Sequence, residues 1–335
     1  MSETRQKIFH VRREYNSWVA NETLEDYALR YTPRSFRKWS ELRVANTALG
    51  AVSFLALEAI GGAIALNYGF TNALWAILVV GLLTFLTGLP ISYYAARHGV
   101  DMDLLTRGAG FGYLGSTLTS LIYASFTFIF FALEAAIMGL AVQMLTGWPL
   151  PICYVLSSLI VIPVVTYGVT LISRLQMWTQ PIWLLLWLCP FVAVAIHRPE
   201  TYVAFTTLAG RSTGHSDFDL SAFGLAATVA FSLVVQIGEQ VDYLRFLPEK
   251  TRENRVRWWM AVLAAGPGWV VPGMLKMLAG AFLAFLVLQN EVPIDKAVEP
   301  TQMYLAGFSE VFPSPAWAMA VTVLFVVLSQ IKINV

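Results

Sequence analysis

Charged residues are scarce in this chain. Only 13% of its 335 residues are Asp, Glu, Lys or Arg, whereas a typical soluble domain has about 25%. Acidic and basic residues nearly balance, which leaves a formal net charge of +1. We therefore expect no nucleic-acid partner, because such partners require a basic surface. With 57% hydrophobic residues and a mean hydropathy of +0.62, the composition predicts a chain that lies mostly in a lipid bilayer.

Cysteine and histidine are also rare. Cys153 and Cys189, the two cysteines, lie in separate apolar stretches, too few and too isolated for a disulfide framework or a thiolate metal site. The four histidines all lie outside the long apolar stretches, which excludes a histidine relay within the membrane. No phosphate-binding loop, paired metal ligands or catalytic Ser/His/Asp arrangement is present in the sequence. We therefore expect neither enzyme activity nor a bound cofactor or metal in this chain.

Long apolar runs fill most of the sequence. Runs of about 20 apolar residues predict membrane-spanning helices, and about eight are found here. They lie near Val44 to Leu66, Asn72 to Ala95, Ser116 to Leu145, Ile152 to Leu171, Met177 to Ile196, Leu220 to Gly238, Trp258 to Leu288 and Ala316 to Val335. The sequence thus predicts an all-α membrane protein, a multi-span helical bundle over residues 44–335 that follows a polar N-terminal segment over residues 1–43.

The basic residues predict an orientation. Positive charge is retained on the cytoplasmic side of a membrane protein. If the N-terminus is cytoplasmic, the inner segments hold seventeen of the 22 basic residues and the outer segments three, while Lys276 and Lys332 lie within spans. We therefore predict a multi-pass protein of the cell (inner) membrane with a cytoplasmic N-terminus.

Two glutamates, Glu58 and Glu134, lie well inside predicted spans. A carboxylate at this depth costs about 2.5–3.5 kcal/mol on insertion scales, so it normally faces a cavity, a partner or a transported species. Phe130 lies four residues before Glu134 and therefore shares its helix face. A flat ring stacked on Phe130 would donate its N–H groups to the Glu134 carboxylate. For the aromatic residues alone, packing or contact with lipid is the competing interpretation.

Glycines beside ionisable residues indicate where helices are discontinuous. Transporters commonly bind solute where a helix unwinds, because the freed backbone groups supply polar ligands. The first span has Gly61 and Gly62 shortly after Glu58, and the sixth ends with Gln236 and Glu239 on either side of a glycine. If both spans break there, we expect contacts with the substrate from Glu58, Gly61, Gly62 and Gln236. The alternative is that the glycines allow close helix packing and that Glu239 lies at the inner membrane surface.

One motif after the sixth span resembles a known family. The segment from Val241 to Phe246, with Asp242, Tyr243 and Arg245, is similar to the signature of the nucleobase-cation symport-1 permeases for purines, cytosine, allantoin and hydantoins. The resemblance implies a fold of two inverted five-helix repeats, with substrate bound between the first, third, sixth and eighth spans. It also implies substrate-binding roles for Phe130, at a position where many members stack a tryptophan, and for Glu134, where some members have a glutamine.

The resemblance also implies a coupling ion. In the last span, Lys332 falls about where small hydroxyl residues help hold sodium in some family members, and Asn334 matches an asparagine that follows them; Ser329, one turn before, is a further coupling candidate. A fixed ammonium at Lys332 would replace that ion, and we hypothesise that it pairs with Glu58. Sodium dependence would then be lost, or replaced by proton coupling through Glu58 or Glu134. The alternative is that Lys332 extends to the cytoplasmic surface, as we also expect of Lys276 unless its helix is locally broken.

Two functions remain open from the sequence. The first is a secondary transporter of a nucleobase-like heterocycle that works by alternating access and is coupled to Na+ or H+. The second is a transporter-like sensory domain that binds such a solute and drives a C-terminal signalling module, such as a histidine kinase. The sequence ends inside the last predicted span, so with about eight spans we expect the five-plus-five fold to be incomplete in its second repeat. Beyond the solute and the lipid bilayer, this module is the one partner that we expect.

Overall fold

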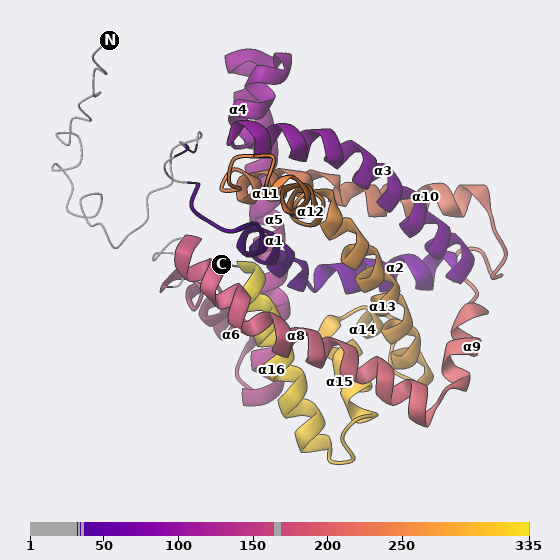
Figure 1. The fold of residues 1–335 in the computed structure, drawn as a ribbon. Helices are drawn as coiled ribbons and strands as arrows, with labels where there is room; N and C mark the ends of the chain where they lie inside the picture. Colours follow the sequence, from indigo (N-terminus) through magenta and orange to yellow (C-terminus); the bar gives the residue numbers. More distant parts are fainter. Residues whose placement is uncertain (1–31, 33, 35–36, 164–168, 335) are drawn as a thin grey trace, which may run out of the picture.

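The chain forms a bundle of helices. Its computed structural model describes residues 32, 34, 37–163 and 169–334, and long helices cross one another around a common core (Figure 1). The elements in chain order are α1 (Glu41–Gly50), η3 (Ala51–Ser53), α2 (Ala56–Tyr68), α3 (Phe70–His98), α4 (Met102–Thr106), η4 (Arg107–Phe111), α5 (Gly112–Thr146), α6 (Leu150–Leu159), α8 (Val169–His197), α9 (Glu200–Thr206), α10 (Leu220–Phe231), η5 (Ser232–Gln236), α11 (Ile237–Leu244), α12 (Arg255–Ala265), η6 (Pro267–Trp269), α13 (Val270–Gln289), α14 (Ile294–Ala297), α15 (Pro300–Ser309) and α16 (Pro315–Asn334).

Six helices of the described residues are long and apolar enough to span a membrane, and the bent pair formed by α1 and α2 makes up to seven. The predicted number of about eight spans is therefore approximate. The difference lies in the predicted fourth span, where α6 has only 10 residues and residues 164–168 lie outside the described residues. The cytoplasmic placement of residues 1–43 also concerns residues that are mostly outside the described part, and it remains a prediction.

The first span is broken, as its sequence predicted, but not at its glycines. Helix α1 and η3 end at Ser53, α2 begins at Ala56, and the two parts differ in direction by 50°. At Phe54 the backbone leaves the helical region, with φ −43° and ψ 103°. The last residue of η3, Ser53, donates its hydroxyl to the backbone oxygen of Ser329 in α16 at 3.1 Å. The break is therefore held against the last span.

Glycines in α2 and α13 bring these two helices into close contact. A Cβ atom on Gly61 would lie 1.9 Å from the backbone oxygen of Met277, and one on Gly280 would lie 2.2 Å from the Cα atom of Glu58. A Cβ atom on Gly62 would lie 2.7 Å from the Met303 side chain. Close packing, the alternative explanation for Gly61 and Gly62, is the one that the structure supports.

The sixth span is continuous and the seventh is interrupted. The sixth, from Leu220 to Leu244, is continuous, and η5 tightens its middle into a 3-10 turn. The expected break there was wrong, since 3-10 hydrogen bonds keep the chain helical. In the seventh span, α12 ends at Ala265, and η6 connects it to α13. Proline at residue 267 accounts for this change because it cannot donate a backbone hydrogen bond.

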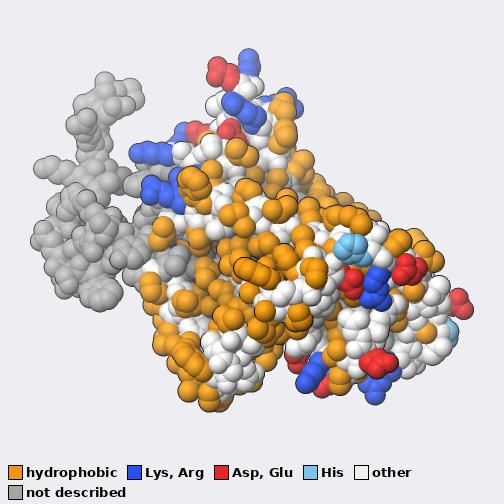
Figure 2. All heavy atoms as spheres, turned by 90° about the horizontal axis from the view of Figure 1, so that it is seen from below, with side chains coloured by type: hydrophobic (Ala, Val, Ile, Leu, Met, Phe, Trp, Pro, Cys, Tyr) orange, Lys and Arg blue, Asp and Glu red, His pale blue; other side chains and the backbone are white. Residues whose placement is uncertain are grey.

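The surface of the bundle is mainly apolar. Figure 2 shows hydrophobic side chains over the middle of one face, with charged side chains gathered toward its edges. Two short helices, α14 and α15, connect α13 to α16 where the sequence predicted an outer loop. Helix α15 is buried on one side, and Met303, Tyr304 and Phe308 have no exposed surface. Together with the apolar spans, this surface defines a multi-pass membrane protein.

Candidate functional site

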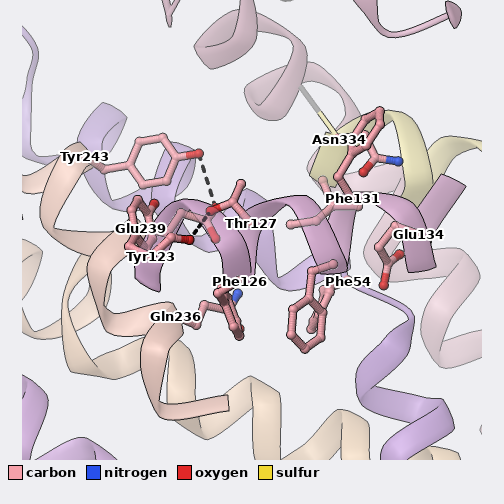
Figure 3. Close-up of a pocket in the computed structure, with 12 residues that line it drawn as sticks. Phe54, Tyr123, Phe126, Thr127, Phe131, Glu134, Gln236, Glu239, Tyr243 and Asn334 are labelled. Atoms are coloured by element: carbon pink, nitrogen blue, oxygen red, sulfur yellow. Dashed lines mark hydrogen bonds between the residues drawn. The ribbon is translucent and has the colours of Figure 1, made fainter. Parts of the chain in front are cut away.

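A cavity of about 200 Å³ lies beside the break in the first span (Figure 3). Its walls come from the break itself, from α5, from η5 and α11, and from the end of α16. The lining residues are Phe54, Tyr123, Phe126, Thr127, Phe130, Phe131, Glu134, Gln236, Glu239, Tyr243, Ile333 and Asn334. Four residues for which the sequence predicted substrate or coupling roles therefore meet in one cavity: Phe130, Glu134, Gln236 and Asn334.

The Glu134 carboxylate caps the N-terminus of α2. Its Oε1 atom accepts the backbone N–H of Ala56 at 2.8 Å, and its Oε2 atom accepts that of Leu55 at 3.2 Å. Leu55, the N-cap residue, provides no side-chain cap of its own. The free N–H groups of a helix start favour a negative charge, so a carboxylate from α5 stabilises the break. Glu134 is 1% exposed, and its side chain still lines the cavity.

Aromatic rings form one wall of the cavity. The Phe130 ring lies 5.0 Å from the Phe54 ring and 4.4 Å from the Phe126 ring, both measured between centroids and both tilted. Phe128, by contrast, is 74% exposed and faces away from the core. The phenylalanines of α5 thus fall into two groups. Phe126 and Phe130 line the cavity, as the binding interpretation predicts, and Phe128 is exposed, as contact with lipid predicts.

Polar groups lie at both ends of the cavity. In Figure 3, Glu134 and Asn334 lie at one end, and Glu239 and Tyr243 lie at the other. The Tyr243 hydroxyl is 3.5 Å from Oε1 of Glu239, to which it donates. Among the described residues, Gln236 Oε1 and Asn334 Nδ2 are buried without a hydrogen-bond partner. A buried polar atom without a partner is costly, so these two atoms provide an acceptor and a donor for a bound molecule.

Glu58 does not line this cavity. It lies in the first turn of α2, is fully buried, and accepts three hydrogen bonds at Oε1. The donors are Lys276 Nζ at 2.6 Å, the Tyr304 hydroxyl at 2.8 Å and Trp187 Nε1 at 3.3 Å. These residues come from α13, α15 and α8, so one carboxylate joins four helices. We call Glu58, Lys276, Tyr304 and Trp187 the Glu58 cluster.

The predicted ion pair between Glu58 and Lys332 was wrong. Glu58 pairs with Lys276, and both side chains are at most 1% exposed. Close packing of α2 on α13 through Gly61 and Gly280 brings these two charges together. Lys276 therefore does not extend to the membrane surface; of the two explanations offered for it, the local helix break is the one that the structure contains, between α12 and α13. Its ammonium also lies 5.0 Å from the centroid of the Trp183 ring, a contact that favours a cation.

Lys332 has different partners. Its ammonium donates to Gln176 Oε1 and, at 3.1 Å, to Thr179 Oγ1, both in α8. Gln176 Nε2 donates in turn to the backbone oxygen of Lys332 at 2.7 Å. The Gln176 side chain packs directly on Gly50, the last residue of α1. The Lys332 side chain is buried, so it does not extend to the cytoplasmic surface either.

The remaining predicted residues lie around the cavity or behind it. Ser329 accepts a hydrogen bond from Trp183 Nε1 at 2.8 Å and so fixes α16 to α8. In the segment that resembles the permease signature, Tyr243 lines the cavity and Asp242 is half-buried beside it. The guanidinium of Arg245 lies 4.9 Å from the centroid of the Phe246 ring, outside the cavity.

Sequence reasoning missed Phe54, Tyr123, Tyr304 and Trp187. Phe54 and Tyr123 are aromatic residues in apolar stretches, where nothing distinguishes them from packing residues. For Tyr304 a signal was present, since it lies in a ten-residue apolar segment (residues 300–309) that is typical of a buried helix rather than of a loop.

No group of three or more His, Cys, Asp or Glu side chains that would hold a metal ion occurs in the described part of the chain. The cavity itself offers a small molecule an aromatic surface, two carboxylates and two amide atoms without a hydrogen-bond partner.

Membrane-spanning helices with a break beside a central cavity define a class of protein: this is the fold of secondary transporters with discontinuous helices. No protein-family model matches the sequence, and no curated protein matches it.

Solved structures do match. One is Mhp1, a nucleobase-cation-symport-1 family transporter, in a closed conformation with bromovinylhydantoin bound, with a TM-score of 0.58 and 16% identity over 91% of this chain and 74% of that one. Another is the inward-facing conformation of Mhp1, with a TM-score of 0.66 and 18% identity over 93% of this chain and 65% of that one. The chain thus spans about two thirds to three quarters of the length of Mhp1. At these identities the similarity shows the fold, and the predicted resemblance is confirmed at that level.

Proposed function

We propose that the protein is a secondary transporter that binds a small, flat nucleobase-like heterocycle in the cavity and moves it by alternating access. The observation that supports this proposal best is the cavity beside the broken first span, in which an aromatic wall faces a buried carboxylate and unpartnered amide atoms. Its volume of about 200 Å³ is below the 300 Å³ or so where pockets for drug-sized ligands begin, which favours a solute of one or two rings.

The chemistry of the lining suggests how such a solute binds. Its ring would stack on Phe130, and a ring N–H would donate to the Glu134 carboxylate. A ring carbonyl would accept a hydrogen bond from Asn334 Nδ2, and a second N–H would reach Gln236 Oε1. Rings with alternating N–H and C=O groups, such as hydantoins, pyrimidines, purines and allantoin, have this pattern, and the Mhp1 structure in the closed conformation holds a hydantoin derivative. The sensory alternative has no support from these comparisons, because both structures are of a transporter.

A binding measurement tests the proposal. The purified chain should be stabilised against thermal unfolding by one heterocycle from a panel of purines, pyrimidines, allantoin and hydantoins, since a ligand of the native state raises stability with its concentration. Phe130→Ala should weaken that binding by about 5- to 150-fold, because base-aromatic stacking is worth about 1–3 kcal/mol. Phe128→Ala is the matched control, as Phe128 lies on the same helix but is exposed. If no heterocycle stabilises the protein, or if both variants weaken binding equally, the substrate proposal fails.

We further propose that the Lys332 ammonium replaces a coupling cation. The C-terminal end of a half-helix attracts positive charge, and Lys332 binds Gln176, which packs on Gly50 at the end of α1. Heterocycle binding should therefore keep its affinity when Na+ is replaced by K+ or choline at constant ionic strength. A strict requirement for Na+ would contradict this. Coupling then falls to protons, with Glu58 and Glu134 as the candidate groups.

A further inference from the structure

Two open cavities adjoin at the end of α3, away from the central site. One is lined by Arg34, Tyr93, Ala96, Arg97, His98, Glu249, Lys250 and Trp258, and the other by Tyr94, His98, Val100, Leu104, Leu105, Gly108 and Ala109. Each has a volume of about 610 Å³, and His98 belongs to both. We call them the basic cavity and the apolar groove. Neither belongs to the solute site described above.

The basic cavity has an excess of positive charge. Arg34, Arg97 and Lys250 face a single acid, Glu249, which pairs with Arg34 at 2.5 Å. Arg97 donates to the Tyr93 hydroxyl at 3.0 Å, which holds its guanidinium at the rim of the cavity. Arg97 and Lys250 thus have no acid of their own among the described residues that line the cavity. This arrangement fits a phosphate group, which takes charge-assisted hydrogen bonds from arginine and lysine.

Aromatic rings hold Lys250 in place. Its ammonium lies 4.9 Å from the Trp259 ring centroid and 5.3 Å from that of Trp258. The Tyr93 ring stacks on the Trp259 ring, with a centroid distance of 5.3 Å and an interplanar angle of 9°. Trp258 is further fixed by donating its Nε1 proton to the backbone oxygen of Pro248 at 2.9 Å. Tryptophan and tyrosine beside basic residues at a span end are typical of the membrane-water interface.

The apolar groove continues from this cavity along α4 and η4. Leu104, Leu105 and Val100 line it, and the Tyr94 ring lies parallel to the His98 ring at 6.2 Å where the two cavities meet. At Gly108 an added Cβ atom would meet no atom within 4 Å, so the groove is open there. A ligand that fills both cavities has an anionic head and an apolar chain.

We propose that this paired site binds an anionic phospholipid, with the headgroup phosphate between Arg97 and Lys250 and an acyl chain in the apolar groove. Basic pockets between spans at a membrane surface are suited to such headgroups. The lipid would lie across the ends of α3 and α12 and fix the loop between α11 and α12, which follows the cavity-lining Tyr243. A zwitterionic lipid such as phosphatidylcholine carries the same phosphate, but its quaternary ammonium offsets that charge and is repelled by Arg97 and Lys250, so it would bind more weakly.

The full chain, purified in a neutral detergent, tests this inference with dioleoylphosphatidylglycerol and dioleoylphosphatidylcholine as probes. Phosphatidylglycerol should raise the unfolding temperature and remain bound in native mass spectra, and phosphatidylcholine should do both to a much smaller extent at the same concentration. Arg97→Gln with Lys250→Gln should raise the lipid concentration for half-maximal effect by at least tenfold. The control pair Arg252→Gln with Arg257→Gln removes the same charge from exposed residues that do not line the site, and it should leave that concentration unchanged.

A third variant tests the groove without altering charge. Gly108→Phe should weaken phosphatidylglycerol binding severalfold because the ring occupies the path of the acyl chain. Equal stabilisation by both lipids would overturn the proposal, since the cations would then have no role. Stabilisation by inorganic phosphate alone, to the extent seen with phosphatidylglycerol, would overturn it in favour of a soluble anion.

Discussion

Replacing Lys276 by methionine is expected to lower the free energy of unfolding by about 3–5 kcal/mol, the cost of removing one partner from a buried ion pair. Methionine is apolar and similar in length to lysine, so it leaves the Glu58 carboxylate buried without a cation. The Tyr304 and Trp187 hydrogen bonds to Glu58 stabilise the charge only in part. A lower midpoint of thermal unfolding in detergent, compared with the unmodified protein, would show the effect.

A second variant separates charge from packing. Glu58→Gln with Lys276→Met removes both charges and keeps an oxygen that accepts from Tyr304, and we expect it to recover most of the lost stability because neutral replacement of a buried pair is often tolerated. Lys296→Met is the control, since Lys296 is exposed in the connection before α15 and its loss should change stability by less than about 1 kcal/mol. If Lys276→Met is as stable as the unmodified protein, Glu58 does not depend on the ammonium.

The features that could be predicted from the sequence are those that depend on spacing within a single helix. Phe130 and Glu134 lie four residues apart, and any α-helix places them on one face, so their meeting in the cavity did not depend on the rest of the fold. The apolar runs likewise predicted most spans, because length and hydropathy are local properties. The fourth span differs, because α6 has only 10 residues and residues 164–168, which follow it in the same apolar run, lie outside the described residues.

Distances between helices could not be predicted in this way. Glu58 had two candidate partners, Lys276 and Lys332, and choosing correctly required the close packing of α2 on α13 through glycines. The position of the break in the first span depends on Glu134, which is 78 residues from the backbone N–H of Ala56 that it caps. Tyr304 reaches Glu58 from α15, 246 residues further along the chain. The local sequence can indicate that a residue such as Tyr304 is buried, but it does not indicate these partners, because each contact forms when separate elements pack together.

Glu134 is expected to have two measurable roles, and two substitutions distinguish them. Glu134→Ala removes the acceptor for the N–H groups of both Leu55 and Ala56, at a cost of about 1–3 kcal/mol for each buried group left without a partner. Glu134→Gln keeps one oxygen and therefore one of these bonds, so its unfolding temperature should fall less. Glu200→Ala is the control, since Glu200 is an exposed acid in the first turn of α9 and contributes at most about 1 kcal/mol.

The Glu134 substitutions should change the affinity for the heterocycle in a different ratio from the one in which they change stability. Glu134→Gln replaces the charged acceptor by a neutral amide, so a charge-assisted hydrogen bond to a ring N–H loses about half its strength, and we expect affinity to fall roughly tenfold, equivalent to about 1.4 kcal/mol. Isothermal titration of both Glu134 variants at a temperature where each is folded provides the comparison. Unchanged affinity in Glu134→Gln, together with the predicted loss of stability in Glu134→Ala, would mean that the carboxylate caps α2 without contacting the solute. The ring N–H groups would then have to donate to Glu239 or Gln236, at the other end of the same cavity.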